Sequence, residues 1–268
     1  MNMLWQMAAI ARTELRFGLR RGWPVVGTAV VGLVVSTGIL YMTFLDMEGM
    51  PRSYAAQDGA MMLAMVWPAF QWLALGVLPI VAAPAIPADR QFGVAELLRS
   101  LPLSGGIYLA GKVLGTVAAV LLTGATVLTL HVLLHLALVG QLNPGLYLEL
   151  TLLSALPLLV WAPAAGVLAA CSLRTRRAAI FIGALVSIAG PLCWGLAFRA
   201  NLRPFVGTAS QLSRQVASDF VLGRYGLHPS WVPPVTGQEV ARGLLVALLE
   251  LLAVGIFARL WLWWKENF

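Results

Sequence analysis

Long uninterrupted runs of apolar residues alternate with short polar segments along this chain. Six runs reach the length of roughly 20 mostly apolar residues that a helix needs to cross a bilayer. They cover 23–45, 60–86, 113–139, 150–172, 178–198 and 243–264. The pattern predicts an all-α polytopic membrane protein with six transmembrane helices, forming a single membrane domain over 1–268.

The composition supports this interpretation. Of 268 residues, 60% are hydrophobic and 11% are charged, whereas a soluble domain carries about 25% charged residues. A soluble globular protein is thereby excluded, and two cysteines are too few for a disulfide scaffold. The net charge of +7 is therefore interpreted through membrane topology, and no nucleic-acid partner is expected.

The basic residues orient the predicted bundle. With both termini inside, the inner segments hold 12 of the 18 Lys and Arg residues, and the two short outer loops hold only Arg52. The remaining five lie in or beside the outer loop 199–242. The positive-inside rule then places both termini in the cytoplasm of a multi-pass protein of the inner, or plasma, membrane. No cleavable signal pattern accompanies the first run, which we expect to be a retained helix.

Residues 1–22 have a different pattern. Apolar residues recur there at helical spacing: Leu4, Ala8, Ala11, Leu15 and Leu19. Arg12, Arg16 and Arg20 form a basic ridge four residues apart. These features predict an amphipathic helix in the inner interface, where anionic headgroups attract the ridge. The alternative is an ordinary positively charged flank of the first span.

The segment between the second and third runs also has helical periodicity. Apolar residues repeat every three positions: Phe92, Ala95, Leu98 and Leu101. Charged residues supply the other side, so a short amphipathic helix is predicted over 88–101, stopped by Pro102. Such a helix can dock in the groove of a cytosolic partner. The alternative is a solvated connector. In the outer loop 199–242, a second small helix is predicted before the last span.

Catalytic and nucleotide-binding patterns are scarce. Residues 106–112 have the glycine and lysine spacing of a phosphate-binding loop, but Val113 stands where that motif requires Ser or Thr. No nucleophile–base pair is recognisable. We therefore expect the chain not to be an enzyme and to bind no cofactor. Any ATP and magnesium would be held by a partner subunit.

Three polar residues within the apolar runs are weaker candidates for a site. His131 and His135 share one helix face, a spacing that suits a shared metal, with Glu149 as a conceivable third ligand. Because no cluster of acids or cysteines accompanies them, no metal is predicted; water or backbone groups could equally satisfy both histidines. Glu250 is an acid well inside the last run, where a substrate path or a subunit interface would explain it. A misplaced span boundary is the alternative.

The segment 89–112, DRQFGVAELLRSLPLSGGIYLAGK, resembles the loop between spans two and three of ABC-2 type permeases, the membrane subunits of ATP-binding-cassette exporters. The matching positions are Asp89, Gly93, Glu96, Leu97, Leu98, Pro102, Leu103, Ser104, Gly111 and Lys112. Val94 replaces the usual threonine, and Gly105 stands where a basic residue is common.

The resemblance implies a function. Two permease chains, identical or different, would face each other, and each would dock a cytosolic ATP-binding-cassette ATPase. Closure of the ATPases would move substrate outward between the permeases. The residues implied in coupling to the ATPase are Asp89, Arg90, Phe92, Gly93, Glu96, Leu97, Leu98, Arg99 and Pro102. Two other classes stay open: a secondary transporter driven by an ion gradient, and a non-transporting membrane scaffold subunit.

Overall fold

The computed structural model describes residues 3–20, 74–94, 104–139 and 155–199, and single residues at 144, 147, 148, 151, 252, 255 and 256. Every secondary-structure element within these residues is helical, which confirms the predicted all-α class for this part of the chain. The run 23–45 and the outer-loop helix lie outside the described residues, as does most of the run 243–264.

The longest of the described helices, α5, covers Gly105–Val139. It begins eight residues before the predicted third run. Ser104 caps its start, since the backbone N–H of Ile107 donates to Ser104 Oγ at 3.3 Å. Within the described part of the chain, one helix is long and apolar enough to cross a membrane: Gly105–Ala137, with a mean hydropathy of 2.2.

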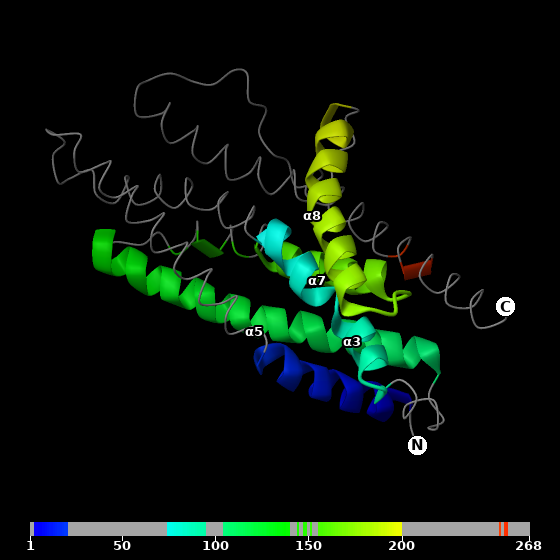
Figure 1. Ribbon diagram of the computed structural model, residues 1–268. Helices are drawn as coiled ribbons and strands as arrows, with labels where there is room; N and C mark the ends of the chain where they lie inside the picture. The colour runs from blue at the N-terminus through cyan, green and yellow to red at the C-terminus, as the bar shows by residue number, and fades with distance from the viewer. Residues whose placement is uncertain are drawn as a thin grey trace, which may run out of the picture.

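Helices α7 (Leu156–Ala170) and α8 (Arg176–Arg199) pack with the helix over 74–82 (Figure 1). Glycines allow the close approach. A Cβ on Gly166 of α7 or on Gly183 of α8 would lie 2.5 or 2.7 Å from the Pro79 carbonyl oxygen. Because real side chains do not fit at these distances, only glycine permits this packing.

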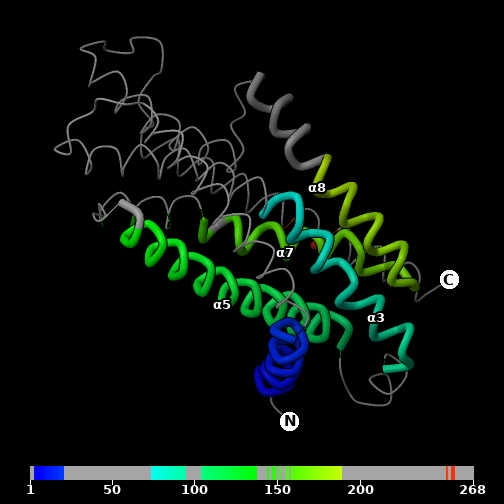
Figure 2. Tube along the Cα trace, turned by 60° about the vertical axis from the view of Figure 1, so that its left-hand side comes forward, coloured from blue at the N-terminus to red at the C-terminus, as the bar shows by residue number. Residues whose placement is uncertain are grey.

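The helix over 3–20 lies against the first turns of α5 (Figure 2). A Cβ on Gly111 would meet Ile10 Cβ at 2.8 Å, and one on Gly18 would meet Ala119 Cβ at 2.7 Å. The contacts advance in the same direction along both helices. This is the close packing that small residues four apart allow between helices.

The helix predicted over 88–101 is interrupted within its described part, and residues 95–101 lie outside the described residues. The observed helix, α3, covers Ala85–Gln91, and a turn at Ala83 and Pro84 separates it from the helix over 74–82. At the other end, Gly93 has a φ of 73°, the left-handed conformation that ends a helix and that glycine adopts without steric cost. The amphipathic periodicity across this position did not reveal the break.

Candidate functional site

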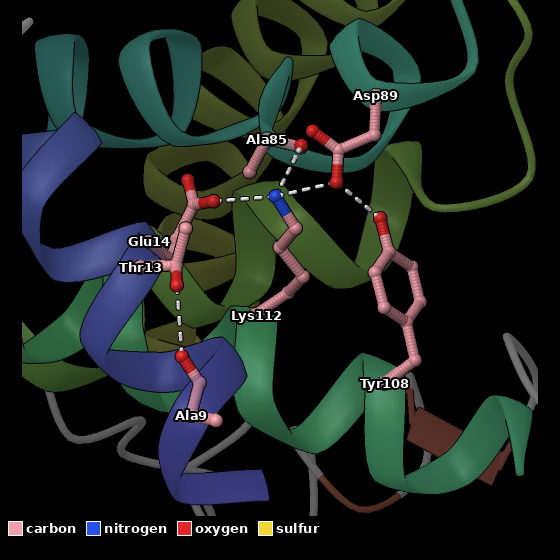
Figure 3. Close-up of polar contacts among 7 residues, drawn as sticks. All are labelled: Ala9, Thr13, Glu14, Ala85, Asp89, Tyr108 and Lys112. Carbon is pink, nitrogen blue, oxygen red and sulfur yellow. Dashed lines mark hydrogen bonds and ion pairs between the residues drawn. The ribbon is translucent and has the colours of Figure 1, made fainter. Parts of the chain in front are cut away.

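A buried ionic cluster joins three helices around the side chain of Lys112. The Lys112 ammonium lies 2.5 Å from Glu14 Oε2 and 2.6 Å from Asp89 Oδ2, and it donates to the Ala85 carbonyl oxygen at 3.3 Å. Figure 3 shows the nitrogen between these three acceptors. An ammonium has three protons to donate, so all three find a partner in the cluster.

Tyr108 adds a second α5 contact to the same carboxylate. Its hydroxyl donates to Asp89 Oδ2 at 2.6 Å (Figure 3), and Lys112 Nζ lies 5.9 Å from the centre of its ring. Tyr108 and Lys112 are four residues apart, on one face of α5. Asp89 is therefore held by two neighbouring side chains of one helix.

Close helix packing brings Glu14 to this cluster. A Cβ on Gly115 would lie 2.5 Å from the Ala11 carbonyl oxygen and 2.6 Å from Glu14 Cβ. Glu14 is 5% exposed and Lys112 is 7% exposed. Buried charges at this depth require partners, because removing them from water costs several kcal/mol per ion. The glycine thus places the carboxylate where Lys112 can neutralise it.

Within the contacts of the cluster, one ammonium faces two carboxylates, and the positive charge of Arg90 also acts on Tyr108. The basic ridge of the N-terminal helix does not contribute to these contacts, since Arg12, Arg16 and Arg20 are exposed. The predicted ridge is thus accessible on the outside of the helix, while Glu14 is buried on the opposite side.

The predicted coupling residues fall into two groups. Asp89 and Arg90 are attached to the bundle: Asp89 contacts α5, and Arg90 Nη1 donates to the Leu173 carbonyl oxygen at 2.8 Å. Phe92 is 69% exposed, next to the turn at Gly93. The other predicted residues lie outside the described residues: Glu96, Leu97, Leu98, Arg99, Pro102 and Glu250.

The two histidines are buried, at 3% and 2% exposure for His131 and His135. Their ring centres are 6.2 Å apart, and the ring of Tyr147 stacks on His131 at 6.1 Å. Nε2 of His131 has no hydrogen-bond partner among the described residues. Among the described residues no group of three possible metal ligands occurs, and Glu149 lies outside them.

Tyr147 connects the segment before α7 to α5 at Leu128. Its hydroxyl donates to the Leu128 carbonyl oxygen at 2.8 Å. Burial raises the pKa of the Tyr147 phenol, because the ionised form would lose its hydration. The phenol therefore stays protonated and keeps this bond.

The roles of Glu14 and Tyr108 and the burial of Lys112 were not predicted from the sequence. Two signals were present: Tyr108 and Lys112 at helical spacing, and Gly111 and Gly115 four residues apart, which is a helix-packing pattern.

No protein-family model matches this chain, and neither does any curated protein sequence. The resemblance to ABC-2 type permeases thus stays a prediction, and the segment 89–112 is its most specific support.

Proposed function

We propose that this chain is the membrane-spanning permease subunit of an ATP-driven exporter. The six apolar runs and the positive-inside distribution support membrane insertion. Helix α5 adds support, because only 22% of its most apolar stretch of 18 residues is buried within the chain. An apolar helix with so much uncovered surface suits a lipid or subunit environment. The outward arginine ridge and the 72% exposed Trp5 suit the headgroup region on the inner side.

The observation that carries the proposal is the exposed end of α3. Phe92 is 69% exposed directly after a helix whose last turn is attached to α5 through Asp89. An exposed aromatic side chain on an anchored turn is suited to fill an apolar pocket in a partner, and such residues dominate interface energies. In the proposed assembly, that partner is the cytosolic ATPase.

In this proposal, the chain binds neither ATP nor magnesium; both belong to the ATPase. Its own residues have two tasks. Phe92 and its neighbours engage the ATPase, and Asp89 and Arg90 connect that contact to α5 and to the segment after α7. A second permease chain would complete the export path.

The buried cluster also favours a second candidate, the secondary transporter. Buried ionisable residues in membrane proteins often bind coupling ions, and Glu14, Asp89 and Lys112 form such a group. The cluster lies near one end of α5 rather than at its middle, however, and coupling-ion sites typically lie near the bilayer midplane. The exporter is therefore favoured.

Purification of the full chain from its own cells, in lipid nanodiscs, tests the proposal. We expect a copurifying protein whose sequence contains a complete phosphate-binding loop, together with ATP hydrolysis that vanadate inhibits. Phe92→Ala should weaken this association about tenfold, since truncating an interface anchor costs more than about 1 kcal/mol.

The matched control is Phe181→Ala. Phe181 on α8 is 64% exposed, so the two variants remove similar exposed side chains at different places, and only Phe92→Ala should weaken the association. Absence of a nucleotide-binding partner from the wild-type preparation would contradict the exporter, and transport that depends on an ion gradient without ATP would favour the second candidate.

A further inference from the structure

We propose that Lys112 is a positioning residue that holds the α3 tip, residues 89–94, against α5, and that Asp89 is its releasable partner. The inference rests on the proposed function in one respect: the ATPase is what would pull on the tip. The contacts of the cluster allow Asp89 to separate from Lys112, whichever partner binds the tip.

The charge composition of the cluster makes the release possible. Lys112 contacts two carboxylates, so it keeps the Glu14 partner at 2.5 Å when Asp89 moves away. A cluster of one lysine and one acid could not open in this way, because opening would leave a buried ammonium without a carboxylate partner. The second carboxylate therefore makes the tip detachable.

The two carboxylates differ in their freedom to move. The Glu14 side chain is 6% exposed, and its Cβ is confined by Gly115. The Asp89 side chain is 18% exposed, so water can reach it and replace Lys112 and Tyr108 as donors. Of the two carboxylate partners of Lys112, Asp89 thus separates at the lower cost.

The contacts of Asp89 and Arg90 determine to which helices a displacement of the α3 tip is transmitted. Asp89 connects the tip to α5 through Lys112 and Tyr108, and Arg90 connects it to Leu173, between α7 and α8. With Asp89 attached, a displacement of the tip is transmitted directly to α5. With Asp89 released, the tip can move while α5 and the N-terminal helix stay joined through Glu14.

A distance measurement between spin labels tests this proposal in the full chain. Labels on cysteines replacing the exposed Gln91 in α3 and the exposed Thr126 in α5 report the position of the tip in nanodiscs. Cys171 and Cys193 are first replaced by alanine. The unmodified cluster should give mainly one distance, and Asp89→Asn should raise the ratio of a second distance to the first about tenfold, since a charge-assisted contact is lost.

The controls separate the two arms of the cluster. Glu14→Gln leaves Lys112 paired with Asp89, so it should keep the wild-type distance. Asp89→Glu preserves the charge and should restore most of the first distance. Asp89→Asn and Glu14→Gln each retain one acid for Lys112, so both variants should fold.

A wild-type distribution in Asp89→Asn would overturn the proposal. So would an equal change in Glu14→Gln, because the cluster would then act as a single unit. The measurement needs no ATPase. If Asp89→Asn releases the tip but no ATPase copurifies with the wild type, the exporter proposal is wrong and the releasable contact stands. If an ATPase copurifies but Asp89→Asn does not release the tip, only the releasable contact is wrong.

Discussion

At the scale of single residues, Lys112 is the centre of the structure's buried polar network. By sequence it lies on the inner flank of the third predicted apolar run, yet it is 7% exposed and forms ion pairs with two acids from other helices. Replacing Lys112 and replacing either Glu14 or Asp89 have different physical consequences. Without Lys112, two carboxylates face each other in a buried site; without one acid, a balanced pair remains.

We therefore expect Lys112→Met to lower the free energy of unfolding by about 3–5 kcal/mol, as measured by denaturant or thermal unfolding of the full chain in detergent. Arg16→Met is the matched control, because Arg16 is exposed and surface changes usually stay within about 0.5 kcal/mol. Equal stabilities of the two variants would show that the cluster does not stabilise the fold.

His131 allows a second test at this scale. Its Nε2 is buried without a partner in the part of the chain that the structure describes, while its ring packs against Tyr147. His131→Phe keeps an aromatic ring there and removes the unsatisfied nitrogen, so stability should be unchanged or rise by about 1 kcal/mol. The melting temperature with and without added zinc is the measurement. A large loss in the variant, together with zinc stabilisation of the wild type only, would instead identify a metal ligand.

At the scale of elements, the N-terminal helix packs closely against α5 because glycines of α5 have no side chains to keep the two backbones apart. Gly111 and Gly115 let the two backbones approach, and Glu14 then reaches Lys112. The packing and the ion pair depend on each other, because Gly115 lies directly beneath Glu14.

Gly115→Leu should therefore separate the two helices and break the contact between Glu14 and Lys112. We expect a destabilisation of at least about 1–3 kcal/mol from overpacking, and a longer distance between spin labels on Arg16 and Leu122. Gly106→Leu is the control, since a Cβ at Gly106 would meet nothing within 4 Å. An unchanged distance in Gly115→Leu would contradict the close packing.

Sequence patterns predicted local structure well and partnerships poorly. The spacing of apolar residues and of Arg12, Arg16 and Arg20 predicted the helix that the structure shows over 3–20. The burial of Glu14 could not be predicted in the same way, because its partner Lys112 is 98 positions away. The end of α3 was missed for a local reason: Gly93 terminates the helix, although the apolar spacing continues past it.

At the scale of the whole molecule, α5 carries buried Lys112 and Thr116 toward one end and buried His131 and His135 toward the other. Lys112 and His131 are separated by about 28 Å along the helix at 1.5 Å per residue, close to the roughly 30 Å hydrocarbon core of a bilayer. Buried Ala119 and Val127 lie between them. This arrangement suits the proposed membrane-spanning role, in which Lys112 and His131 lie toward opposite surfaces of the bilayer.

Topology gives a test at this scale. Single cysteines at Arg176 and Asn143, in a chain without Cys171 and Cys193, should react with a membrane-impermeant maleimide from opposite sides. The positive-inside distribution predicts that Asn143→Cys reacts in intact cells and that Arg176→Cys reacts only after permeabilisation. Reaction of both from outside would contradict the six-span topology.

The most direct measurement of the central claim is photocrosslinking from the α3 tip in living cells. A photoreactive phenylalanine analogue is placed at Phe92, with Phe181 as the matched position, and crosslinked products are identified by mass spectrometry. The exporter predicts a crosslink from position 92, and none from position 181, to a cytosolic protein with a complete phosphate-binding loop. The absence of that product at position 92, or its equal formation at position 181, would contradict the claim that the α3 tip docks an ATPase.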